Sequence, residues 1–141
     1  MYMHNGYWVP SRVPGGFMVE VDGAEVILKP FGNYDGLHFE NVIFDGLMLA
    51  KSSFNGARFT GCSMDATEFS HSDFRSARFD GCTMTNISLV FCDLTDVVFS
   101  QCAAPRSRCH ATRLTRTVAT DTDLAGSGFD ESIIALSLIH I

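Results

Sequence analysis

Cysteine and histidine are the side chains of this sequence that could do chemistry, and their spacing argues against most of it. The chain has five cysteines, none in a C-x-x-C pair. This argues against a zinc ribbon and against a secreted disulfide framework. The five histidines are scattered, with no pair at metal-ligand spacing: His4, His38, His71, His110 and His140. We therefore predict free thiols and no metal.

Three of the cysteines follow one another at intervals of twenty residues: Cys62, Cys82 and Cys102. One turn of a coil with that period would bring them close enough to consider a bridge. However, they share their place in the repeat described below with alanine and serine, which indicates a buried position. Buried cysteine usually acts as a small hydrophobe with an unreactive neutral thiol.

Sequence motifs of catalysis and cofactor binding are missing. The chain has no P-loop, no G-x-S-x-G elbow, no G-x-G-x-x-G fingerprint and no H-E-x-x-H. We predict no catalytic residue, no cofactor and no enzymatic activity.

Charge and hydropathy narrow the class of partner. The 141 residues are 46% hydrophobic and carry a formal charge of -6, which argues against direct nucleic-acid binding and against an anionic membrane surface. Residues 1–10 show no basic segment followed by an apolar one, and no stretch approaches the roughly 18 apolar residues of a membrane span. We predict a cytoplasmic protein.

The chain repeats itself with a period of twenty residues. FNGARFTGCSM, from Phe54, and FRSARFDGCTM, from Phe74, share seven of eleven letters. Beneath this lies a period of five. Large apolar residues occupy thirteen successive positions: Phe39, Phe44, Leu49, Phe54, Phe59, Met64, Phe69, Phe74, Phe79, Met84, Leu89, Leu94 and Phe99.

A second, mostly small series stands two residues before these positions. Since residues i-2 and i of an extended segment point to one side, each unit of five sends one large and one small side chain inward. The inward small column includes Ala57, Cys62, Ser72, Ala77, Cys82, Cys92 and Cys102. Four such units make a square coil of twenty residues, with turns stacked about 4.8 Å apart.

This pattern resembles the pentapeptide-repeat family, whose motif A-[DN]-L-x-x has a central Leu or Phe and a small residue two positions before it. The match extends from about Leu37 to Ile134. The resemblance implies an all-β fold, a right-handed quadrilateral parallel β-helix of about five coils.

Three segments are expected along the chain. Residues 1–34 alternate apolar and polar side chains around Asp22-Gly23, which predicts a β-hairpin that caps the coil. Residues 35–135 form the repeats. Residues 136–141, LSLIHI, match the translation of a sequencing-library adaptor and are predicted to be a non-native tail. In that case the sequence is truncated, and the natural chain continues past this point.

Apolar residues at outward positions identify a candidate contact for a partner: Val90, Phe91 and Val98. The leading hypothesis is a non-enzymatic, rigid protein-interaction or scaffold module whose protein partner is unknown. The family resemblance implies an alternative, a DNA mimic that binds type II topoisomerase and protects it from quinolones. A further alternative is a repeat domain of a longer protein, with a homodimer if the full C-terminus is present.

Overall fold

The computed structural model describes residues 1–130, 132 and 138–139. Within these residues the chain is all β. The strands are β1 (Tyr2–His4), β2 (Tyr7–Val9), β3 (Ser11–Val13), β4 (Gly16–Val21), β5 (Ala24–Leu28), β6 (His38–Glu40), β7 (Arg58–Thr60), β8 (Arg78–Asp80), β9 (Val98–Ser100), β10 (Val118–Thr120) and β11 (Leu138–Ile139). No helix suited to crossing a membrane occurs in this part of the chain.

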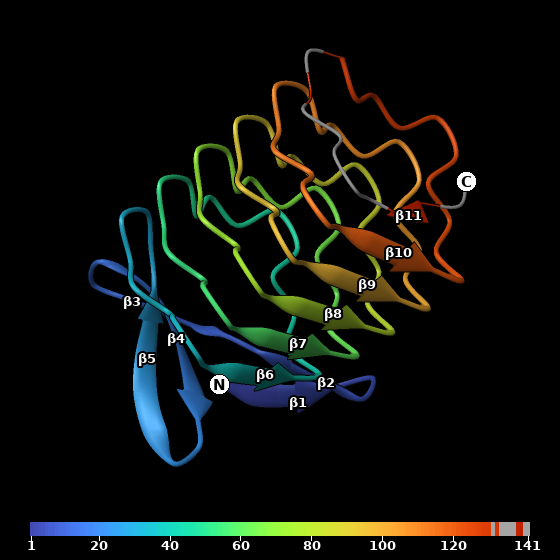
Figure 1. Ribbon diagram of the computed structural model, residues 1–141. Helices are drawn as coiled ribbons and strands as arrows, with labels where there is room; N and C mark the ends of the chain where they lie inside the picture. The colour runs from blue at the N-terminus through green and yellow to red at the C-terminus, as the bar shows by residue number, and fades with distance from the viewer. Residues whose placement is uncertain (131, 133–137, 140–141) are drawn as a thin grey trace.

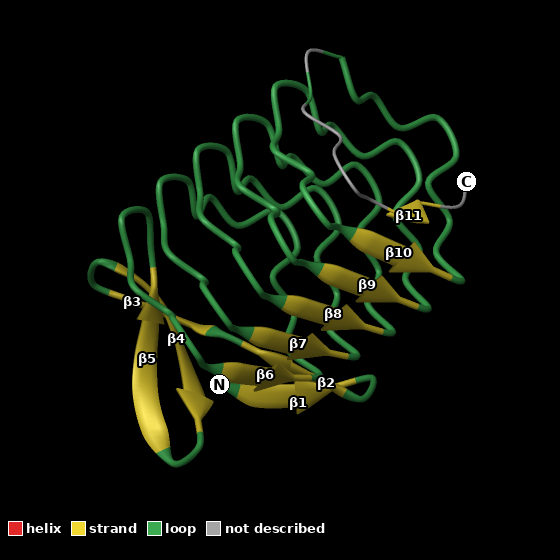
Figure 2. Ribbon diagram, viewed as in Figure 1, coloured by secondary structure: helices red, strands yellow, loops and turns green. Residues whose placement is uncertain are grey.

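Residues 32–130 wind into a solenoid whose turns each take twenty residues (Figures 1 and 2). Strands β6 to β10 lie side by side in a parallel sheet, and Phe39, Phe59, Phe79 and Phe99 are direct partners in it. From β6 to β10 the chain makes four full turns, with partial turns at both ends, where about five coils were expected.

We number the four sides of the coil by their central inward residues. The first face carries β6 to β10, the second is centred on Met64, the third on Phe69 and the fourth on Phe74. The second, third and fourth faces are held by single parallel bridges between residues twenty positions apart, for example Ser63↔Thr83, Glu68↔Ser88 and Asp73↔Asp93. Every face is therefore a ladder along the axis of the solenoid.

The interior contains all thirteen large residues of the repeat, each at most 8% exposed. The seven residues of the small inward column are buried beside them. Rings of the first face stack in parallel, with centroids 4.8 Å apart for Phe59 and Phe79 and 4.9 Å for Phe79 and Phe99. Stacked rings and backbone hydrogen bonds thus share one repeat distance, so the same register serves both.

The N-terminal segment forms a three-stranded antiparallel sheet, β3-β4-β5, at one end of the solenoid (Figure 1). Its β4–β5 hairpin turns at Asp22-Gly23, where both residues have positive φ, 51° and 80°, as a two-residue turn requires. Val19 and Leu28 are buried in the common core. The hydroxyl of Tyr34 donates to the Ile27 carbonyl at 2.8 Å and so ties β5 to the first turn.

A second hairpin, β1–β2, was not anticipated from the sequence. It turns at Asn5-Gly6, again with positive φ at both residues. Trp8 of β2 bridges Val42, so the hairpin adds to the first turn of the second face. At the other end, the 136–141 tail lies outside the described residues except Leu138–Ile139, which pair with β10 as β11.

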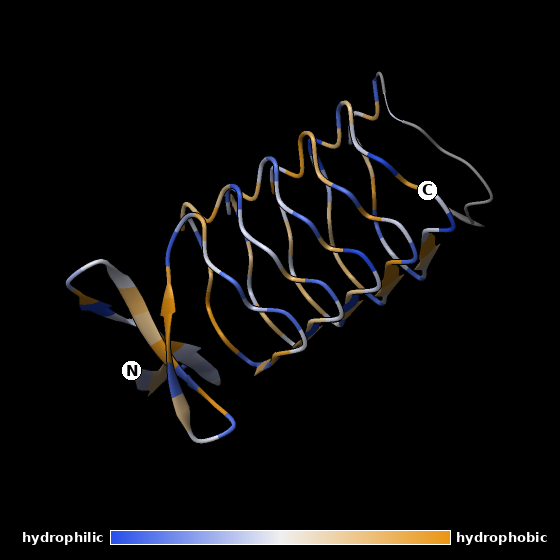
Figure 3. Ribbon diagram, turned by 60° about the vertical axis from the view of Figure 1, so that its left-hand side comes forward, coloured by the Kyte–Doolittle hydropathy of each residue, from blue (hydrophilic) through white to orange (hydrophobic). Residues whose placement is uncertain are grey.

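Figure 3 shows apolar and polar residues alternating along the coils, as side chains turn inward and outward.

Replacing Phe74 by Ala removes a ring that stacks on Phe54 at 4.9 Å and meets Phe69 edge-on at 5.1 Å. We expect unfolding free energy to fall by about 3 to 5 kcal/mol, because hydrogen-bonded coils relax poorly around a cavity. Chemical denaturation measures this.

Arg58→Ala is the control for the Phe74 substitution. Arg58 is exposed on β7, and a surface change of this kind stays within about 0.5 kcal/mol. Equal stability of the Phe74→Ala variant and the unmodified protein would contradict the inward register.

Candidate interaction surface

The cysteine thiols lie in the interior, away from solvent. All five cysteines are free and buried. Cys62, Cys82 and Cys102 each donate to the carbonyl 23 residues earlier, at 3.3, 3.2 and 3.3 Å. Burial raises the pKa of Cys92 and of Cys109 to about 12, so both are neutral thiols at physiological pH. Within the described residues no group of His, Cys, Asp or Glu is arranged to hold a metal ion.

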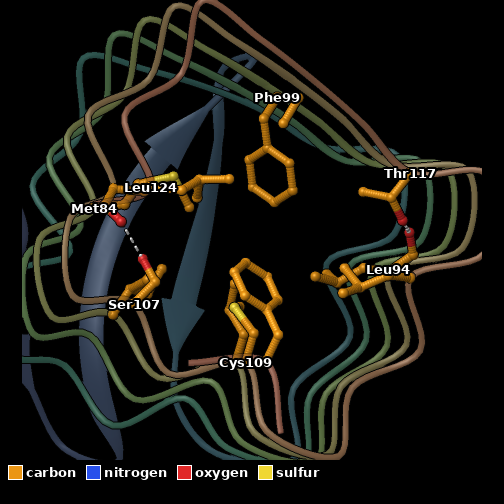
Figure 4. A pocket seen from close by; sticks show the side chains of 13 residues that line it. Met84, Leu94, Phe99, Ser107, Cys109, Thr117 and Leu124 are labelled. Carbon is orange, nitrogen blue, oxygen red and sulfur yellow. Dashed lines mark hydrogen bonds between the residues drawn. The ribbon is translucent and has the colours of Figure 1, made fainter. Parts of the chain in front are cut away.

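An apolar cavity of about 20 Å³ lies inside the last coils (Figure 4). It arises where the large inward residues give way to small ones, Ala104, Cys109 and Ala119. The hydroxyls at its wall are engaged, since Ser107 donates to the Ala104 carbonyl and Thr117 to the Leu94 carbonyl. Ligand pockets have volumes of about 300 to 1,000 Å³, so this cavity is a packing defect and not a binding site.

A shallow polar groove lies at the corner between the fourth and first faces, lined in part by Arg75 and Arg116. Each arginine pairs with a nearby aspartate: Arg75 with Asp73 at 2.8 Å and Arg116 with Asp96 at 2.6 Å. The hydrogen bond from Arg116 lowers the pKa of Asp96. Because both cations are already matched by carboxylates, the groove offers little net charge to a ligand.

The corner between the third and fourth faces carries a different kind of ladder: Phe31, Lys51, His71 and Phe91, which we call the corner ladder. Its members stand twenty residues apart and all are exposed, Phe31 by 74% and Phe91 by 56%. The His71 and Phe91 rings stack with centroids 4.8 Å apart and 11° between planes. The ammonium of Lys51 lies 5.3 Å from the centre of the Phe31 ring.

The backbone of the corner ladder is held in a fixed geometry. The amides of Lys51, His71 and Phe91 donate to the next turn, at 3.0, 3.0 and 3.1 Å. Phe31 and Phe91 have φ of 61° and 59°, a left-handed conformation in which bulky residues are rare. Other corners fill the same place with Gly46, Asn41 or Asn86. Two phenylalanines therefore occupy positions at which the backbone conformation favours glycine or asparagine.

The three predicted contact residues fall in two places. Phe91 belongs to the corner ladder, and Val90 precedes it, partly buried in the same turn. Val98 is also partly buried but lies on β9, in the first face, beyond the fourth face along the chain. Sequence reading missed Phe31, Lys51 and His71 as neighbours of Phe91; counting back by twenties from Phe91 would have found them.

Family models match most of the repeats. One described as a pentapeptide repeat region matches residues 35–109, and another, described as pentapeptide repeats in eight copies, matches residues 92–129. No curated protein matches the chain.

Solved structures share the solenoid at low sequence identity. A pentapeptide-repeat protein from the cyanobacterium Cyanothece, Rfr23, is 12% identical with a TM-score of 0.50; the match covers 74% of this chain and 88% of that one. QnrB1, a plasmid-mediated fluoroquinolone resistance protein, is 16% identical with a TM-score of 0.43, over 79% and 68% of the two chains. HetL from the cyanobacterium Nostoc is 12% identical with a TM-score of 0.42, over 78% and 60%.

Ala104→Leu should stabilise the protein. Ala104 follows Met84 and precedes Leu124 in the inward column of the second face and lines the cavity, so a leucine there fills the defect. We expect a gain of about 1 kcal/mol in unfolding free energy. Ala57→Leu, at a fully buried position that does not line this cavity, is the matched control and should lose about 1 to 3 kcal/mol. Destabilisation by both substitutions would contradict the packing defect.

Thiol titration tests the burial of the cysteines. At neutral pH the folded protein should release almost no chromophore from an aromatic disulfide reagent, and the denatured protein should release five equivalents, one for each free cysteine. The reason is that reaction requires an accessible thiolate. Rapid reaction of any thiol in the folded protein would show that one of these sites is open.

Proposed function

The chain belongs to the pentapeptide-repeat family, and from this premise we propose that it is a non-enzymatic protein-interaction module that binds a protein partner through its corner ladder. Three features of the described residues support the non-enzymatic part. The nucleophilic thiols are buried, the apolar cavity holds about 20 Å³, and the polar groove has its arginines paired with aspartates. None of these provides an enclosed site with an available reactive group.

The observation that carries the proposal is the pair of exposed phenylalanines on one rigid corner, Phe31 and Phe91. Aromatic side chains dominate the binding energy of protein interfaces because they bury a large area with few rotatable bonds. Here the hydrogen-bonded corner fixes the backbone beneath each ring, so little entropy remains to be lost when a partner binds. Lys51 and His71 between the rings add hydrogen-bond donors.

The partner that fits this ladder presents an apolar or aromatic side chain to each ring and an acceptor between them. The chemistry of the ladder supports a protein surface or peptide over a nucleic acid, since the chain is acidic overall. The DNA-mimic alternative has less support. Exposed arginines, such as Arg58 and Arg78 on the first face, interrupt the continuous negative charge that a duplex presents.

The experiment is selection from a displayed peptide or protein library on the unmodified protein, followed by titration of the selected binders. The Phe31→Asn/Phe91→Asn double variant should bind them at least tenfold more weakly, or about 1.4 kcal/mol. Asparagine suits the left-handed conformation of these corners. The unfolding free energy of the double variant, checked by thermal melting, should therefore change by no more than about 1 kcal/mol.

Met48→Asn is the matched control, because Met48 is 70% exposed on the third face and outside the corner ladder. It should bind as the unmodified protein does. Full retention of binding by the double variant would refute a role for the ladder. A supercoiling assay with DNA gyrase and a quinolone addresses the alternative, and protection by both the unmodified protein and the double variant would favour DNA mimicry instead.

A further inference from the structure

The outer edge of β1 has backbone groups that face away from the rest of the protein. The N–H of Trp8 donates to Asn41 at 2.6 Å, and the carbonyl of Trp8 accepts from Ile43 at 3.0 Å. Trp8 therefore directs both groups toward the first turn. Met3 lies opposite Trp8 in the hairpin, and the two residues form a pair without backbone hydrogen bonds between them. The N–H and carbonyl of Met3 consequently point outward, away from β2.

This edge continues the ladder of the second face. From the outside inward the order is β1, β2, Val42 and Ile43 of the first turn, and then Ser63 of the next. Figure 1 shows β1 at the margin of the molecule, with the β4–β5 hairpin to one side. In the described part of the chain, β1 pairs with β2 alone. A strand placed against β1 would therefore lengthen the solenoid along its axis.

Exposed apolar side chains gather on the same hairpin. Tyr2 is 61% exposed, Met3 49% and Trp8 36%. They are half of the six large hydrophobic residues that the described chain exposes. Apolar side chains gain free energy when they are removed from water, so these residues favour a further layer against the hairpin.

The other open edges of the N-terminal segment carry features that discourage strand pairing. The edge strand β3 lies between Pro10 and Pro14 and contains Arg12, while β5 contains Glu25 and is followed by Lys29. Proline and charge on edge strands are established protection against association. By contrast, β1 (Tyr2–His4) has no proline, lysine, arginine or carboxylate.

We propose that this edge is a homodimer interface, in which β1 of two copies pairs antiparallel about a two-fold axis at Met3. The two Met3 residues then exchange both backbone hydrogen bonds, and each Tyr2 lies opposite a His4. One apolar row then crosses the joined sheet, made of Trp8 and Met3 from each of the two copies. The pairing brings no acid, lysine or arginine of β1 or β2 against its own copy, because neither strand carries one. It does not depend on the corner ladder.

Sedimentation equilibrium over a range of concentrations tests the interface. The unmodified protein should move from 15.5 kDa toward twice that mass as its concentration rises. Met3→Pro removes the outward N–H without taking a hydrogen bond from β2, and Met3→Lys places two ammonium groups together at the two-fold axis. Both variants should remain at the monomer mass, because each change acts on the shared strand edge.

Met48→Lys is the control, since it introduces the same charge at an exposed methionine on the third face. It should dimerise as the unmodified protein does. Melting curves should show that all variants are folded. A monomer at every concentration of the unmodified protein would overturn the proposal, as would dimers that persist in both Met3 variants.

Discussion

The fixed twenty-residue turn is the constraint on which the rest of this structure depends. Each turn bonds to the next through its backbone, so Phe59 must lie on Phe79 and Ser63 beside Thr83. An inserted residue would move every later large side chain out of the interior, because inward positions recur every five residues. The stacked rings, the buried cysteines and the left-handed corners all follow from keeping this count.

The same constraint shapes what the surface can do. A residue on one face has neighbours twenty positions away, so side-chain contacts form along the axis, as between Arg116 and Asp96 or between His71 and Phe91. Other contacts join residues two apart in one turn, as between Arg75 and Asp73. Convergence of three or four different side chains on one point, which catalysis requires, is difficult on such a surface. Ladders of similar or paired side chains arise readily, and they suit recognition of an extended partner.

Sequence alone was sufficient for the part of the fold that the period controls. The buried ladder from Phe39 to Phe99 and the turn at Asp22-Gly23 follow from local rules, namely alternation and turn chemistry. The β1–β2 hairpin has an equally local signal in Asn5-Gly6, but its place beside Val42 depends on a contact across more than thirty residues. The corner ladder could be counted from the sequence, whereas the stacking of His71 on Phe91 depends on side-chain orientation, which the period leaves open.

Phenylalanine at a left-handed corner shows how a rigid repeat can carry residues that local conformation disfavours. At most corners the chain uses glycine, asparagine or another small or polar residue, and φ near 60° is held at all of them. A bulky side chain in this left-handed conformation costs of order 1 to 3 kcal/mol of folding free energy. The conformation persists only where the surrounding structure holds the backbone in place. Hydrogen bonds to the adjacent turns supply that restraint at Phe31 and Phe91. Neither ring adds to the core, so the contacts within the chain that offset this local cost are those of the corner itself, the stacking of Phe91 on His71 and the approach of Lys51 to Phe31.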